Sequence, residues 1–137
     1  MSDDAIRQLF DAARDVRARA YAPYSKFRVG AALRGADGKI YAGANVENVA
    51  YPQSQCAEAS AIGVMVAAGC TEIVEIMVLA CGKDSGVVAP CGGCRQRLSE
   101  FAASGVRVHL ADESGVKTSL TMGELLPWRF GPRQIGS

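Results

Sequence analysis

The chain has 137 residues, of which 49% are hydrophobic, a length that suits one domain with one core, so we expect residues 1–137 to form a single domain. The formal net charge is +1, and 15 basic and 14 acidic side chains are mixed along the sequence, which argues against a nucleic-acid partner. The N-terminus lacks the features of a signal peptide, and the longest mostly apolar stretch, residues 62–70, is too short for a bilayer span, so we expect a cytoplasmic protein without a membrane partner.

The first half of the chain predicts a helix followed by a β-hairpin. Ser2 can cap the helix, and apolar residues recur at helical spacing until about Ala20. Residues 27–33 alternate as a strand does, and the turn at 35–38 leads to a returning strand at 39–45. A polar loop is expected over residues 46–55. The apolar stripe of the helix is assigned to the core.

The second half predicts strands that alternate with helices. The expected elements are a buried helix at 56–68, a strand covered on both faces at 73–80, a loop at 82–89, a helix at 91–103 and a strand at 106–110. A capping-box pattern, Thr121 to Glu124, predicts a short helix over 122–126. This order of elements predicts an α/β sandwich built on a mixed sheet.

The cysteines argue against a disulfide framework. There are five, an odd number in a chain without a secretion signal. Thiols in a reducing compartment point to metal binding, nucleophilic chemistry or burial.

Two short segments combine thiols with an acid: Cys56-Ala57-Glu58 and Pro90-Cys91-Gly92-Gly93-Cys94. A catalytic zinc needs three protein ligands and an open position for water. Cys91 and Cys94 are neighbours on the first turn of a predicted helix, and Cys56 would supply the third ligand from the start of another. A helix N-terminus also stabilises thiolates. The pattern therefore predicts a zinc site between two helix starts.

Glu58 is predicted to be an acid/base group and not a ligand. Residues two apart on a helix point about 200° apart, so Cys56 and Glu58 can share a site only if the metal lies over the helix entrance. A carboxylate in that place can take a proton from a water that zinc has acidified.

Other interpretations of these residues remain open. A lone C-x-x-C also occurs in redox centres and in structural zinc sites, which usually have four protein ligands. Cys81 could be a fourth ligand, but it falls in a predicted core strand, and Cys70 is typical of a buried thiol. The single histidine, His109, alternates inside a strand and is assigned a structural role.

The combined motifs match the all-cysteine form of the zinc nucleobase deaminase signature. With them, the chain resembles the small, homotetrameric cytidine deaminases from about Tyr21 to about Phe130. The matching segments are YSKFRVGAAL at 24–33, GANVEN at 43–48, CAE at 56–58, PCGGCRQ at 90–96 and LLPWRFGP at 125–132.

The resemblance implies a three-layer α-β-α sandwich with a mixed five-stranded sheet and one Zn²⁺ per chain, held by Cys56, Cys91 and Cys94. It also implies hydrolytic deamination of cytidine and 2′-deoxycytidine to uridine and 2′-deoxyuridine, with release of ammonia, in pyrimidine nucleoside salvage. Zinc-bound hydroxide would attack C4, and Glu58 would carry protons to the ring nitrogen and the leaving amine.

The resemblance implies substrate contacts as well. Phe27 would pack near the nucleoside, the backbone at Ala57 would contact the pyrimidine, and Asn45 and Glu47 would bind the ribose. A buried pair of this kind would reject a free base, because its polar groups would be left unpaired. The residues expected to reach a neighbouring subunit's site in a homotetramer are Tyr51 and Phe130. From the residues alone, Phe27 is equally a core residue, Asn45 and Glu47 a solvated strand end, and the other two ordinary packing.

One position departs from the family pattern, and other functions stay open. Relatives with three cysteines often carry arginine after the C-A-E glutamate, where this chain has Ala59. An aminohydrolase for a cytosine-containing antibiotic such as blasticidin S uses a similar motif. A polynucleotide-editing deaminase and a non-catalytic zinc-binding module are the remaining alternatives; neutral charge argues against the first, and Glu58 against the second.

Overall fold

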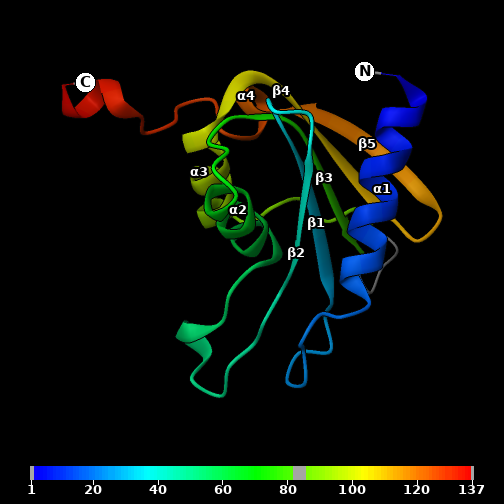
Figure 1. Cartoon of the computed structure of the whole chain (residues 1–137). Coiled ribbons are helices and arrows are strands. Elements are labelled where there is room, and N and C mark those ends of the chain that lie inside the picture. The colour runs from blue at the N-terminus through cyan, green and yellow to red at the C-terminus, as the bar shows by residue number, and fades with distance from the viewer. Residues whose placement is uncertain (1, 82–85, 137) are drawn as a thin grey trace.

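The computed structural model describes residues 2–81 and 86–136, which form one mixed five-stranded sheet with helices on both faces (Figure 1). The helices are α1 (Asp3–Arg17), α2 (Ala57–Ala67), α3 (Gly92–Phe101) and α4 (Met122–Leu125). The strands are β1 (Val29–Gly35), β2 (Ile40–Ala44), β3 (Ile73–Ala80), β4 (Ala102–Asp112) and β5 (Gly115–Thr121). Two 3₁₀ turns, Tyr51–Gln53 and Pro132–Ile135, complete the described elements. The predicted three-layer sandwich is confirmed.

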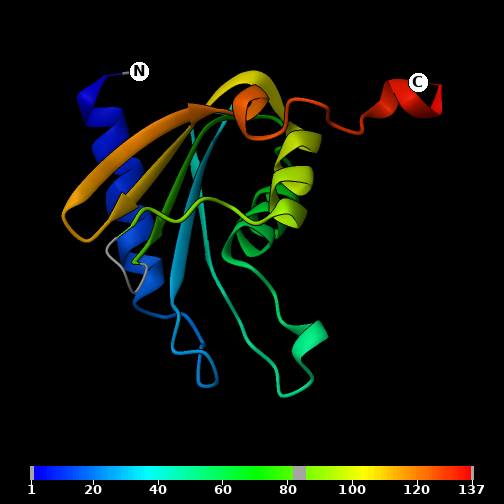
Figure 2. The same ribbon diagram turned by 180° about the vertical axis from the view of Figure 1, so that it is seen from behind.

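The sheet order, β2-β1-β3-β4-β5, combines both kinds of strand pairing. β1 is antiparallel to both β2 and β3, β3 and β4 are parallel, and β5 returns antiparallel to β4. The parallel pair requires a crossover, and α3 lies within it. As a result α2 and α3 lie on the same face of the sheet, while α1 covers the other (Figure 2).

The core has one layer on each side of the sheet. Leu9 and Ala13 of α1 pack with Met77 and Leu79 on one face. The core on the α2–α3 face includes residues of both helices and their partners on β3 and β4, among them Ala61, Met65, Leu98, Ile76, Val78, Val108 and Leu110. β3 therefore contributes to both layers, as its continuous apolar sequence predicts.

Most predicted elements are present, with shifted ends. Ser2 caps α1 by accepting the backbone N–H of Ala5, and the helix ends at Arg17 instead of near Ala20. β1 begins only at Val29, so Phe27 precedes the strand. The capping box of α4 is confirmed.

The fifth strand, β5, has no apolar pattern that would place it from the residues alone. It lies at the edge of the sheet, and its sequence, GVKTSLT, is exposed or half-buried throughout. An edge strand with a polar face pairs through its backbone, which the side chains do not report. β4 likewise begins at Ala102, directly after α3, and not at residue 106.

Gly43 lets α2 pack against β2. A Cβ at this position would lie 2.4 Å from the backbone nitrogen of Ala61, so only glycine fits between strand and helix. This contact sets the height of α2 over the sheet, and with it the place of the residues at its N-terminus.

None of the helices within residues 2–81 and 86–136 has the length and apolar character that a bilayer crossing needs.

Candidate zinc site

Three cysteines meet where α2 and α3 begin. The sulfur atoms of Cys56, Cys91 and Cys94 all lie within 4.8 Å of one another. A tetrahedral zinc with Zn–S bonds of about 2.3 Å places its sulfur ligands about 3.8 Å apart, so small side-chain adjustments suffice. Three thiols without a fourth protein ligand fit a zinc with one open position. Among the described residues, no other group of three His, Cys, Asp or Glu side chains is arranged to hold a metal ion.

The helix starts provide an electrostatic environment for thiolates. Cys56 and Cys91 are the N-cap residues of α2 and α3, so backbone N–H groups of both helices face the cluster. The backbone N–H of Cys94 lowers the pKa of the Cys91 thiol. Burial raises the pKa of Cys56 and Cys94. Bound zinc would overcome this burial penalty, because a coordinated thiol is deprotonated.

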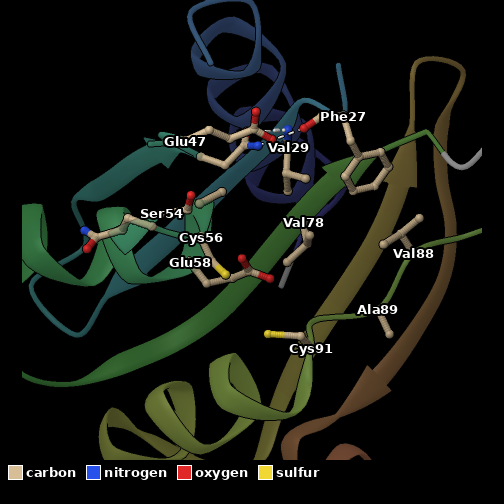
Figure 3. A pocket seen from close by; sticks show the side chains of 13 residues that line it. Phe27, Val29, Glu47, Ser54, Cys56, Glu58, Val78, Val88, Ala89 and Cys91 are labelled. Carbon is tan, nitrogen blue, oxygen red and sulfur yellow. Dashed lines mark hydrogen bonds between the residues drawn. The ribbon is translucent and has the colours of Figure 1, made fainter. Parts of the chain in front are cut away.

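Glu58 is buried beside the thiols, with 4% of its surface exposed. It occupies the first turn of α2, and its carboxylate is turned toward the space between Cys56 and Cys91 (Figure 3). Burial raises the pKa of Glu58, and the positive charge of Arg97 opposes that shift. The predicted arrangement, with the cluster over the entrance of α2, is therefore what the structure shows.

Cys56, Cys91 and Glu58 line a cavity of about 280 Å³ (Figure 3). This volume lies just below the range of about 300–1,000 Å³ typical of small-molecule pockets. Four of the residues predicted to contact substrate also line it: Phe27, Asn45, Glu47 and Ala57. The walls thus combine an aromatic ring, an amide and two carboxylates around the thiol cluster.

Asn45 and Glu47 also form hydrogen bonds with the backbone of the loop that contains Phe27. The Asn45 side chain donates to the Phe27 carbonyl at 2.8 Å and accepts the Val29 N–H at 2.8 Å. The Glu47 carboxylate accepts the backbone N–H groups of Tyr24 and Ser25, at 2.9 and 3.1 Å.

Ser25 was not predicted from the sequence. Its hydroxyl donates to Glu47 and accepts the Phe27 N–H, and this hydroxyl lowers the pKa of Glu47. A serine in a loop carries no distinguishing pattern, so only the fold reveals its role. Phe27 itself is 36% exposed in the cavity wall and is not a core residue.

Tyr51 and Phe130 do not line this cavity. Tyr51 packs beside Tyr24, with ring centroids 5.9 Å apart, next to an adjoining hollow that Glu47 also lines. Phe130 lies on the C-terminal segment that extends away from the sheet (Figure 1). Both rings are exposed, so neither is ordinary core packing within one chain.

The other thiols and the histidine lie outside the cluster. Cys81 is exposed directly after β3, so the prediction that it falls in a core strand is wrong: the strand ends at Ala80. Cys70 is buried, as predicted. His109 is buried on the α1 side of the sheet, where its Nε2 lies 2.6 Å from Glu75, and its structural role is confirmed.

Several wall residues were not predicted from the sequence. They are Val29, Ser54, Gln55, Val78, Val88 and Ala89. Val78 could have been found from the alternation of β3, since it points to the same face as Ile76. The predicted loop at 82–89 lies partly outside the described residues, and its described end contributes Val88 and Ala89.

The fold and the site define an α/β protein with a three-cysteine zinc centre of the catalytic type, beside a buried carboxylate. Comparison with known proteins agrees. Residues 3–110 match the family model described as the cytidine and deoxycytidylate deaminase zinc-binding region. The chain belongs to the cytidine deaminase family.

Individual relatives are similar over nearly their whole length. The cytidine deaminase of Sporosarcina psychrophila is 38% identical over 130 residues, covering 95% of this chain and 94% of the relative. That of Halalkalibacterium halodurans is 40% identical, covering 90% and 92%. The crystal structure of cytidine deaminase from Burkholderia pseudomallei is 39% identical with a TM-score of 0.84, covering 95% of this chain and 100% of that one.

Proposed function

We propose that this protein deaminates cytidine hydrolytically, giving uridine and ammonia, and that 2′-deoxycytidine is a second substrate. The observation that carries the proposal is the position of Glu58, which is buried in the wall of the cavity that Cys56 and Cys91 also line. A structural zinc site needs only its ligands, and a buried carboxylic acid beside them would have no function there. We further propose that the protein acts in pyrimidine nucleoside salvage, as a cytoplasmic single-domain enzyme.

The zinc would be held by Cys56, Cys91 and Cys94, and it would supply the Lewis acidity that makes hydroxide available near neutral pH. Glu58 takes the proton that water loses and donates it to the ring nitrogen N3 of the pyrimidine. Once the oxygen of that water is bonded to C4, Glu58 takes the proton of the new hydroxyl group and transfers it to the amino group, which leaves C4 as ammonia while the C4 carbonyl of uridine forms. A low-dielectric wall around Glu58 favours its neutral form, which suits a group that must hold a proton between two steps.

The remaining wall residues position the nucleoside. The Phe27 ring packs against it, and the backbone of Ala57, at the first position of α2, contacts the pyrimidine. The Asn45 amide donates its remaining N–H at the ribose, and the Glu47 carboxylate accepts a hydrogen bond from a ribose hydroxyl. The same two side chains therefore bind the ribose and hold the Phe27 loop through hydrogen bonds.

The active form is a homotetramer in which Tyr51 and Phe130 complete the site of a neighbouring chain. The exposure of both rings supports this, together with Trp128, which is 96% exposed. The segment that carries Phe130 is tied to its own α3, because the Gln96 side chain donates to the Phe130 carbonyl at 2.8 Å. A segment that holds exposed aromatic side chains away from the sheet is suited to contact with a second copy of this chain.

The substitution Glu58→Gln tests the proposal. The amide keeps the size of the side chain and cannot carry the proton, so we expect cytidine turnover to fall by about 10²–10⁴-fold with zinc content unchanged. Loss of cytidine absorbance and metal analysis provide the two readouts. Turnover equal to that of the wild type would refute the role of Glu58. If zinc-loaded wild-type protein left cytidine intact but converted blasticidin S or single-stranded DNA, the proposal that cytidine is the substrate would be refuted.

A further inference from the structure

The zinc site gathers more negative charge than the metal neutralises. Three thiolates and one Zn²⁺ sum to −1, and Glu58 adds a second negative charge when it ionises. The wall around these groups is largely apolar and includes Val29, Val78 and Ala89. Excess charge of one sign in such surroundings is unfavourable unless a positive group lies nearby. The residue after Glu58 is Ala59, which offers none.

Arg97 is placed to provide that charge. It follows Cys94 by three residues on α3, so both lie on the same side of the helix. Its Nη1 atom lies 3.1 Å from the place where a Cβ on Gly93 would stand. The guanidinium therefore lies back along α3 over Gly93, the residue directly before Cys94 in the first turn of the helix. A glycine at 93 leaves the surface there free for it.

The other arginines near this helix are engaged elsewhere. Arg95 donates to the carbonyls of Pro90 and Leu125, at 2.8 and 3.0 Å, and Arg129 donates to the carbonyl of Ser99. Within residues 2–81 and 86–136, by contrast, Arg97 makes no ion pair with a carboxylate.

We propose that Arg97 offsets the negative charge of the zinc site and thereby raises its affinity for zinc. The proposal rests on the zinc site of the proposed function and adds a charged residue outside the ligand set. Arg97 acts through space and touches no reacting atom. Its contribution therefore depends on its charge, and it weakens when salt screens that charge.

A charge series at position 97 tests the proposal: Arg97→Lys, Arg97→Gln and Arg97→Glu. Zinc affinity is measured by competition with a metallochromic chelator at fixed pH, at low and at high ionic strength. At low salt we expect Arg97→Lys to bind zinc within about twofold of the wild type and Arg97→Gln about fivefold more weakly. Arg97→Glu should lose about a further fivefold, and high salt should shrink all these differences.

Arg7→Gln is the matched control. Arg7 is also an exposed helical arginine, but it lies on α1, across the sheet from the site. It should bind zinc as the wild type does. Equal affinity of Arg97→Gln and wild type at low salt would overturn the proposal. So would a loss in Arg7→Gln as large as that in Arg97→Gln, or a loss that does not change with salt.

The readout is zinc affinity and not turnover. A wild-type protein that fails to deaminate cytidine would therefore refute the proposed function and leave the charge series to be judged separately.

Discussion

Replacing Gly43 by alanine should loosen α2 and disturb the zinc site at its N-terminus. The added Cβ would lie 2.4 Å from the Ala61 nitrogen and 2.7 Å from the Ser60 carbonyl carbon. Ordinary contact begins at 3.4 Å, so the helix must move by about 1 Å (3.4 − 2.4). Both opposing atoms are backbone, which cannot rotate away. The whole of α2 must therefore shift away from β2.

The cost follows from that displacement. Overpacking of this size lowers the free energy of unfolding by about 1–3 kcal/mol. α2 carries Cys56 and Glu58 at its start, while Cys91 and Cys94 belong to α3. Metal–ligand distances tolerate about 0.2 Å, so zinc affinity should also fall. A misplacement of about 1 Å at a catalytic group can reduce turnover by about 10²-fold.

Urea unfolding at fixed protein concentration, chelator competition and cytidine turnover measure the three effects. Gly63→Ala is the control in the same helix, since a Cβ there meets no atom within 4 Å. Alanine is the better helix former, so this variant should gain up to about 1 kcal/mol and keep its zinc. A Gly43→Ala protein with wild-type stability, zinc affinity and turnover would refute the proposed packing constraint.

Two further predictions concern groups away from the zinc. Glu75→Leu leaves buried His109 without its acceptor at 2.6 Å, so the free energy of unfolding should fall by about 1–3 kcal/mol, and unchanged urea unfolding would contradict this. The hydrogen bond to Asp37 raises the pKa of Tyr41 to about 12 and lowers that of Asp37. The tyrosine's contribution to stability should be complete below pH of about 10 and lost as pH rises toward 12; the aspartate's should be present above pH of about 4 and lost at lower pH. Tyr41→Phe should remove the first pH dependence and weaken the second, since the Lys39 N–H still donates to Asp37, which unfolding measured across pH would show.

The zinc ligands could be predicted because their signal is local. Cys91 and Cys94 are three apart at a helix start, and that spacing alone brings their side chains together. Cys56 joined them through the combined motif, in which Glu58 has a chemical reason to stand two residues away. The parallel strand β3 could be placed with correct ends because a strand buried on both faces is continuously apolar.

The parts that sequence did not show depend on contacts between distant segments. β5 is held by backbone pairing at a sheet edge, so its side chains carry no apolar period. The hydrogen bonds by which Asn45 and Glu47 hold the Phe27 loop join residues 18 to 23 positions apart, and no spacing rule indicates them. Tyr51 and Phe130 are exposed in one chain, and their predicted role depends on a second.

The zinc site is also where the local rules of helix formation fail. Helices prefer Ser, Thr, Asp or Asn at the N-cap, and this chain follows that preference at Ser2 and Thr121. At α2 and α3 the N-caps are Cys56 and Cys91, and neither side chain makes a capping hydrogen bond. A missing cap costs about 1 kcal/mol, so two helices start at a disadvantage at one place. Such a shared departure is explained when both side chains serve a common ligand, because zinc binding stabilises the two helix starts together.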